Sequence, residues 1–184
     1  MLSLERACSA ERRRSCTRRE RGVPLPLVAV NLSGTSLNEQ SFVDHVLQSV
    51  AEPAIARALC FEITETTAVT SLANACYLMS ELKGRKCRFA LDDFGSGVSS
   101  FVYLKTLPVD LLKIDGQFIS HTTRDPVNRS MVEAISKVGR ALGIATVAEC
   151  VESEAVLVEL KRIGVDFAQG FYLAKPLAVA QVPD

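Results

Sequence analysis

The stretch Phe89-Ala-Leu-Asp-Asp-Phe-Gly-Ser-Gly97 sets a pattern that the rest of the chain repeats. Residues 88–91 are predicted to form a short apolar strand, which ends in the adjacent carboxylates Asp92 and Asp93 and a turn with two glycines. Hard divalent cations prefer carboxylate oxygens, so this arrangement is typical of a metal-binding or phosphate-handling site. A solvated turn is the alternative interpretation, because Asp and Gly are ordinary turn residues.

Five more apolar segments of strand length occur along the chain, at residues 27–33, 59–65, 109–115, 145–151 and 167–173. The first of them is almost continuously apolar, which predicts a strand buried on both faces. Apolar residues at helical spacing separate the strands, most clearly from Met131 to Leu142, where Gly143 ends the pattern. Strands that alternate with helices indicate parallel βα units, so the predicted fold class is α/β.

Polar residues gather at the carboxyl ends of these strands. They are Asn31, Glu62, Asp92, Asp93, Glu149 and Gln169, with Lys113 inside a further apolar strand. In a (β/α)₈ barrel the active site is built at that end, from one or two residues of several strands. One such residue alone is more simply explained as half of a structural pair, but the repeated placement predicts a shared site.

Composition limits the classes of function. The chain has 184 residues, with 21 Lys and Arg against 21 Asp and Glu, so we expect no general affinity for nucleic acid or a membrane surface. No apolar run reaches the length of a membrane span, and the first residues lack the apolar core of a signal peptide. The six cysteines show no zinc-ligand spacing, which predicts reduced thiols and a cytoplasmic protein.

Three segments are expected. Residues 1–22 are rich in Arg and are predicted to be helical or frayed, residues 23–178 form the domain, and residues 179–184 are a short tail. A basic run can bind nucleic acid or a membrane, but no aromatic residue interleaves this one, so a solvated segment is the favoured interpretation.

Six motifs follow one another along the chain: Asn31-Leu-Ser, Glu62-Ile-Thr-Glu65, Asp92-Asp-Phe-Gly-Ser-Gly97, Leu112-Lys-Ile-Asp115, Val147-Ala-Glu-Cys-Val-Glu152 and Gln169-Gly-Phe. In this order they resemble the motifs of EAL domains, the phosphodiesterases that open the bacterial second messenger cyclic di-GMP to the linear dinucleotide pGpG. The resemblance covers residues 23–177. It implies a variant TIM barrel, here an incomplete (β/α)₈ fold of about six parallel strands.

The resemblance also implies the roles of the site residues. Two Mg²⁺ or Mn²⁺ ions are expected as cofactors, with cyclic di-GMP as the substrate. The expected metal ligands are Asn31, Glu62, Asp92 and Asp93; the expected catalytic residues are Glu149 and Lys113; and Gln169 and Asp115 are expected at the substrate. Glu65 is expected to steady the loop that runs from Phe94 to Ser100, a loop that forms the dimer contact in the family.

The sequence departs from the family pattern in several places. It contains no Glu-Ala-Leu, the motif that supplies a metal ligand and a substrate-holding Arg, and Cys150 stands where a glycine is usual. A complete barrel needs roughly 250 residues, so we expect the first strands to be missing. An open sheet edge would follow. Because one metal ligand and one Arg are missing, we expect this chain alone to be weakly active or inactive. Three hypotheses therefore stay open: a phosphodiesterase, an inactive EAL-like binding or regulatory module, and a fragment without independent function.

Overall fold

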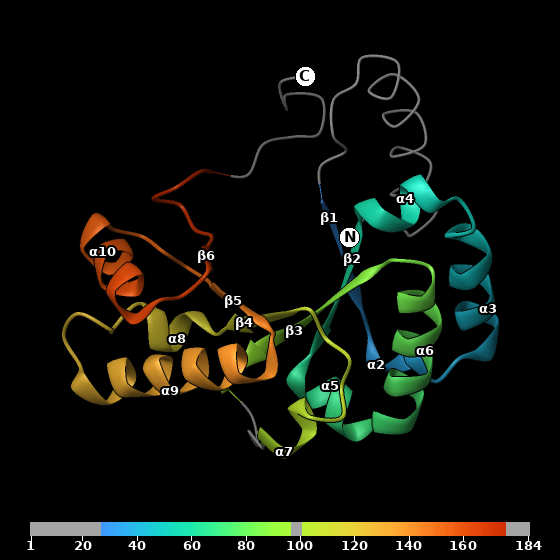
Figure 1. The fold of residues 1–184 in the computed structure, drawn as a ribbon, viewed down its shortest axis with the longest axis horizontal. Helices are drawn as coiled ribbons and strands as arrows, with labels where there is room; N and C mark the ends of the chain where they lie inside the picture. The colour runs from blue at the N-terminus through green and yellow to red at the C-terminus, as the bar shows by residue number, and fades with distance from the viewer. Residues whose placement is uncertain (1–26, 97–100, 176–184) are drawn as a thin grey trace, which may run out of the picture. The chain divides into compact units, whose positions relative to one another are not determined.

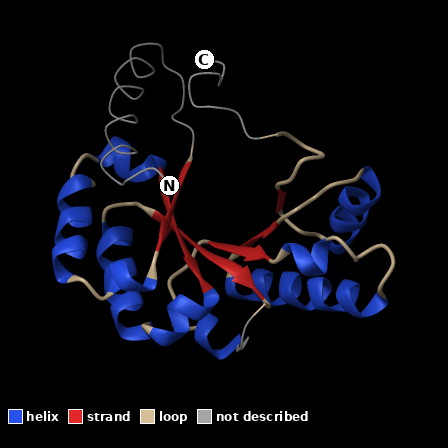
Figure 2. Cartoon of the chain, turned by 180° about the vertical axis from the view of Figure 1, so that it is seen from behind, coloured by secondary structure: helices blue, strands red, loops and turns tan. Residues whose placement is uncertain are grey.

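The computed structural model describes residues 27–96 and 101–175. Six parallel strands alternate with helices, as predicted (Figures 1 and 2). The strands are β1 (Val28–Leu32), β2 (Leu59–Thr64), β3 (Arg88–Phe94), β4 (Leu111–Ile114), β5 (Ala145–Ala148) and β6 (Phe167–Ala168). The helices are α2 (Gly34–Leu37), α3 (Gln40–Ser49), α4 (Pro53–Ala58), α5 (Glu65–Thr70), α6 (Leu72–Gly84), α7 (Phe101–Leu104), α8 (Gly116–Ile119), α9 (Pro126–Leu142) and α10 (Glu154–Ile163).

The chain divides into two compact units. Unit 1 comprises the residues up to Asp92 together with Val98–Leu111, and unit 2 comprises Asp93–Gly97 and the residues from Leu112 onward. The boundary therefore passes through β3, between the two aspartates. The expected segment limits at residues 22 and 179 lie outside the described residues and stay predictions.

Unit 1 is built on parallel pairing of β1 with β2 and of β2 with β3. Its core contains the aromatic rings of Phe61 and Phe89, which occupy paired positions in β2 and β3 and have ring centroids 5.6 Å apart. β2 is almost wholly buried, with only Glu62 and Thr64 half-buried. Helices α3 and α6 contact each other beside these strands (Figure 1).

The prediction that the first strand is buried on both faces is wrong. In β1 only Leu32 is buried, Ala29 and Asn31 are exposed, and Val28 and Val30 are half-buried. Among the described residues β1 pairs only with β2, so it is an edge strand. An edge strand has no strand neighbour on its outer side to remove it from water.

Unit 2 is built on β4, β5 and β6, with β5 and β6 parallel and hydrogen-bonded. Helix α9 packs on β5, α8 and α10. As predicted, α9 ends at Leu142, and Gly143 follows in the left-handed conformation with φ +72°. Ser153 caps α10 by accepting a hydrogen bond from the Val156 N–H.

The last strand is shorter than the predicted segment 167–173, because β6 contains only Phe167 and Ala168. After Gln169 the chain turns: a Cβ added at Gly170 would lie 2.2 Å from the Val151 nitrogen. The Tyr172 N–H donates to the Val151 carbonyl at 3.0 Å. The residues after Gly170 thus fold back over the end of β5 instead of extending the strand.

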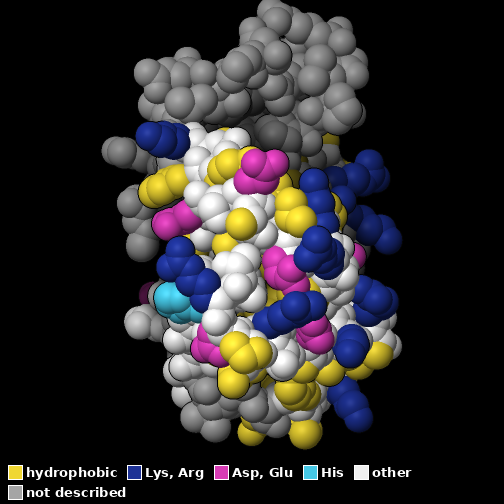
Figure 3. Space-filling view, turned by 90° about the vertical axis from the view of Figure 1, so that its left-hand side faces the viewer, with side chains coloured by type: hydrophobic (Ala, Val, Ile, Leu, Met, Phe, Trp, Pro, Cys, Tyr) yellow, Lys and Arg dark blue, Asp and Glu magenta, His cyan; other side chains and the backbone are white. Residues whose placement is uncertain are grey.

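Figure 3 views the molecule from the side on which α9 and α10 lie in Figure 1, and it shows Lys and Arg side chains mixed with Asp and Glu. Some of these charged side chains form ion pairs. The Arg129 Nε lies 3.1 Å from Oε1 of Glu133 and 3.1 Å from Oε1 of Glu159. Arg162 also contacts Glu159. Within the described residues no helix is both long and apolar enough to cross a bilayer.

The same Val-Asp pair precedes β4 and β6, and in each pair the aspartate accepts a backbone hydrogen bond from a residue of an earlier strand. Asp166 Oδ2 accepts hydrogen bonds from both the N–H and the hydroxyl of Thr146, each at 2.8 Å, at the start of β5. In unit 1, Asp110 Oδ2 accepts from the Phe89 N–H at 2.9 Å. These carboxylates thus accept hydrogen bonds from Thr146 and Phe89, two residues that are buried from water.

We expect Asp166→Ala to lower the free energy of unfolding by about 2 kcal/mol, because the buried Thr146 loses the acceptor of two hydrogen bonds to a charged group. Chemical denaturation followed by circular dichroism measures the change. Asp166→Asn keeps one acceptor oxygen and should lose less. Equal stability of the alanine variant and the parent would contradict this account of the pair.

Candidate active site

An ion pair between a buried lysine and a half-buried glutamate joins β4 to the turn after β5. Lys113 lies in β4 and is only 6% exposed, because the strand around it is apolar. Its Nζ lies 3.0 Å from Oε1 of Glu149, the residue that directly follows β5. A buried ammonium needs a counter-charge, and the sequence places that carboxylate at the end of the neighbouring strand.

Glu149 is held by more than the lysine. Gln169, which follows β6, donates from Nε2 to the same oxygen, Oε1, at 2.7 Å. The backbone agrees with this arrangement, since the Glu149 N–H donates to the Ile114 carbonyl and the Gln169 N–H donates to the Ala148 carbonyl. Two donors on one oxygen fix the direction of the carboxylate.

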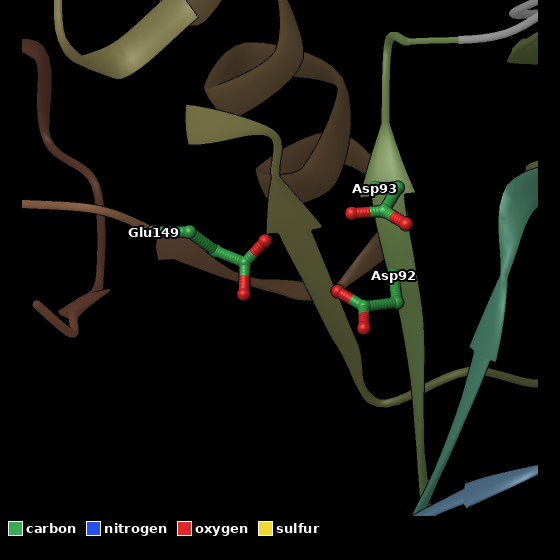
Figure 4. A group of neighbouring side chains, drawn as sticks. All are labelled: Asp92, Asp93 and Glu149. Carbon is green, nitrogen blue, oxygen red and sulfur yellow. The ribbon is translucent and has the colours of Figure 1, made fainter. Parts of the chain in front are cut away.

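A group of acidic side chains lies at this end of the strands. Asp93 and Glu149 each offer a carboxylate oxygen within 4.8 Å of the other, and Asp92, bonded to Asp93 within β3, completes the group (Figure 4). Asp93 is exposed and has φ +53°, a left-handed conformation that Asp tolerates better than most residues. This backbone turn directs the Asp93 side chain away from the alternation of the strand.

The donor set fits a hard divalent cation. Three carboxylates close together repel one another, and a cation that shares their oxygens removes that repulsion. Magnesium and manganese prefer oxygen ligands, and Mg²⁺ commonly takes one or two carboxylates with water and phosphate oxygen in the remaining positions. Asp92, Asp93 and Glu149 are thus a candidate metal site.

The predicted residues of unit 1 occupy neighbouring strands. Asn31 in β1 and Glu62 in β2 are paired in the strand register, which places them side by side, with Asn31 exposed and Glu62 half-buried. Glu65 begins α5 and is only 4% exposed. The ligand roles of Asn31 and Glu62 and the loop-steadying role of Glu65 stay predictions, and part of that loop, 97–100, lies outside the described residues.

Asp115 caps α8, which directly follows β4. Its Oδ1 accepts a hydrogen bond from the Gln117 N–H at 2.7 Å, and the residue is half-buried. The predicted contact between Asp115 and substrate is therefore a second role for a side chain that already has a structural one.

Unit 2 also carries a pocket of about 450 Å³ beside Glu149 and Gln169. The other lining residues are Cys150, Glu152, Gly170, Phe171, Ala174 and Lys175. None of these six residues was predicted to belong to the site. Their positions in the sequence could have identified them, because each lies within six residues of Glu149 or Gln169 in the chain.

The family assignment rests on comparison with known proteins. A protein-family model described as "EAL domain" matches residues 2–176, nearly the whole chain. The chain belongs to the EAL domain family. The predicted resemblance is therefore confirmed. The family is typically metal-dependent, and the acidic group is a candidate metal site in this chain.

Named relatives of this EAL chain include cyclic di-GMP phosphodiesterases. The chain is 38% identical over 154 residues to "Cyclic di-GMP phosphodiesterase PdeB" of Shewanella oneidensis, covering 83% of this chain and 18% of that protein. It spans less than a quarter of the length of the first curated relatives it matches.

Solved EAL structures have the same fold. "PaMucR Phosphodiesterase, c-di-GMP complex" is 36% identical with a TM-score of 0.78, over 84% of this chain and 63% of that one. The EAL domain of Mycobacterium smegmatis DcpA is 32% identical with a TM-score of 0.82, over 95% of this chain and 78% of that one. These neighbours confirm the expected barrel-like α/β fold.

The thiol of Cys150, beside Glu149, has a raised pKa. Partial burial raises the pKa of its thiol, and the negative charges of Glu149, Glu152 and Asp115 raise it further, while Lys113 opposes them. The thiolate is the nucleophilic form, so a raised pKa keeps Cys150 protonated and unreactive near neutral pH.

We expect Cys150 to be alkylated by iodoacetamide at pH 8 more slowly than free cysteine, with EDTA present. Because Glu149 is one cause of the raised pKa, Glu149→Gln should speed the reaction. Peptide mass spectrometry after timed quenching gives the rate at this thiol. Glu133→Gln, on α9, is the matched control and should leave the rate unchanged; equal rates in both variants would refute the electrostatic contribution.

Proposed function

We propose that this chain is a cyclic di-GMP phosphodiesterase domain that hydrolyses the cyclic dinucleotide to linear pGpG. The observation that carries the proposal is the acidic group at the strand ends, with Lys113 paired to Glu149. Support comes from the relative named as such an enzyme and from the solved neighbour named as a c-di-GMP complex.

In this proposal Asp92, Asp93 and Glu149 hold divalent metal, Mg²⁺ or Mn²⁺, together with Asn31 and Glu62 of unit 1. A bound divalent ion polarises a phosphoryl oxygen and makes water a stronger acid. Asn31 and Glu62 support the proposal through their pairing on adjacent strands.

In this proposal Glu149 accepts a proton and Lys113 offsets negative charge. The Glu149 carboxylate, fixed through Oε1, accepts the proton of the water that attacks phosphorus. The Lys113 ammonium, 3.0 Å from that carboxylate, offsets negative charge that develops on the phosphate oxygens. Gln169 and Asp115 contact the substrate, Gln169 from the wall of the pocket.

A second candidate function is binding of cyclic di-GMP without hydrolysis. The printed sequence contains no Glu-Ala-Leu, so neither the metal ligand nor the Arg of that motif is present in it. A module with this residue set would hold the nucleotide and signal through a partner.

We also propose self-association through loop 94–100. The exposed residues Phe101 and Val102, just after that loop, support it.

Metal binding tests the site directly. We expect the metal-free chain to bind Mn²⁺ in isothermal titration calorimetry, and Asp93→Asn or Glu149→Gln to weaken binding at least tenfold by removing an anionic ligand. Glu152→Gln is the matched control, since Glu152 lies three residues from Glu149 but outside the acidic group. Equal affinity in all the variants would refute the assignment of the site.

Hydrolysis is then measured by chromatography of cyclic di-GMP and pGpG with Mn²⁺ or Mg²⁺. We expect weak turnover in the parent chain, because the residues of the Glu-Ala-Leu motif are missing, and we expect Glu149→Gln to abolish it, because the proton acceptor is lost. Nucleotide binding without turnover would select the binding module instead. Absence of both binding and turnover would refute the proposed function.

A further inference from the structure

We infer that the short helix α8 is a positioning element: it sets the distance between the turn that carries Asp93 and the turn that carries Glu149. All three segments belong to unit 2. The inference rests on the proposed function in treating the two carboxylates as ligands of one metal site. Its physical basis is a pair of crowded contacts, one on each side of the helix.

The first contact joins α8 to the Glu149 turn. A Cβ placed on Gly116, the first residue of α8, would lie 2.6 Å from Cys150 Sγ and 2.7 Å from Cys150 Cβ. A thiol can rotate away, but a Cβ atom moves only with its backbone. Gly116 and Cys150 are therefore matched in size, and any larger residue at position 116 displaces the backbone beside Glu149.

The Glu149 turn cannot retreat easily from this contact. The Glu149 N–H donates to the Ile114 carbonyl at 3.3 Å, and the Val151 N–H donates to the Gln169 carbonyl at 3.0 Å. Cys150, between Glu149 and Val151, has φ +51°, a left-handed backbone conformation that residues with a side chain rarely adopt. Hydrogen bonds on both sides thus hold a strained residue against the helix.

The second contact joins α8 to the Asp93 turn. Phe118 is buried, and a Cβ on Gly95 would lie 2.6 Å from Cε2 of its ring. The Asp115 N–H reaches the Phe94 carbonyl at 3.4 Å, and Ser96 donates from both N–H and hydroxyl to the Asp93 carbonyl. The turn that carries Asp93 therefore packs against the Phe118 ring at Gly95.

The helix between the two contacts is itself anchored. Asp115 caps its first turn, Ile119 is fully buried, and α8 packs on the long helix α9 (Figure 1). A shift of α8 toward either turn therefore changes the separation of the Asp93 and Glu149 carboxylates, whose oxygens approach within 4.8 Å. Gly116 and Phe118 are positioning residues, since they act through the turns and not on the substrate.

The test uses a pair of substitutions with opposite effects on size. Gly116→Ala should weaken Mn²⁺ affinity of the full chain by about 10-fold to 100-fold, the usual range for residues that support ligands. Cys150→Gly removes the opposing side chain and suits the positive φ, so the double variant should recover to within a few-fold of the parent. Gly139→Ala is the matched control, because a Cβ there would also be crowded, 2.9 Å from Thr146 Cγ2, but on α9.

Two readouts separate positioning from general stability. Calorimetry gives the Mn²⁺ affinity, and amide NMR shifts of metal-free protein report whether residues 149–151 move. Gly139→Ala should lower the melting temperature without changing either. Unchanged affinity and unchanged shifts in Gly116→Ala, or no recovery in the double variant, would overturn the inference.

Failure of the proposed function has a different signature. If the parent chain binds no Mn²⁺, the metal assignment fails, but the shifts of residues 149–151 and their recovery in the double variant still decide the role of α8. If Gly116→Ala does not fold, Phe118→Leu serves in its place: it should shift the amides of residues 93–96 and lower Mn²⁺ affinity. Unmoved amides in that variant would equally overturn the inference.

Discussion

A lysine ammonium buried inside a strand must meet a negative charge, and this requirement ties the site of the EAL chain together. Lys113 is almost wholly removed from water within β4, and the Glu149 carboxylate lies 3.0 Å away. Desolvation of an ion costs several kcal/mol, and a good partner offsets it. The same oxygen accepts a hydrogen bond from Gln169, so the pair that stabilises the unit also fixes the direction of the carboxylate.

The same end of the strands gathers negative charge. Three carboxylates, of Asp92, Asp93 and Glu149, form the acidic group, and Lys113 forms an ion pair with Glu149. Like charges at short range either take up protons or bind a cation. The acidic group therefore fits a divalent cation, and the buried lysine offsets part of its negative charge.

The alternation of strands with helices and the polar strand ends could be predicted from the sequence, because both follow from apolar runs and the residues that end them. The end of α9 at Gly143 follows the same local rules. Burial of β1 could not be predicted, since the apolar run 27–33 does not tell whether a second strand covers it. The early end of β6 depends on the approach of Gly170 to Val151, a contact between distant residues.

The conformations that direct the site side chains were equally hidden. Of the three non-glycine residues with positive φ in the described ranges, two are Asp93 and Cys150, one carrying a site carboxylate and the other following Glu149. Such a backbone costs about 1 kcal/mol or more for a residue with a side chain, so the surrounding contacts must hold it. Parallel strands bring their ends to one edge, but they alternate side chains between two faces. The left-handed conformation of Asp93 breaks that alternation and changes the direction of its own side chain. Parallel strands thus bring the carboxylates to one edge, while the backbone of Asp93 directs one of them and Lys113 and Gln169 hold the other, on Glu149.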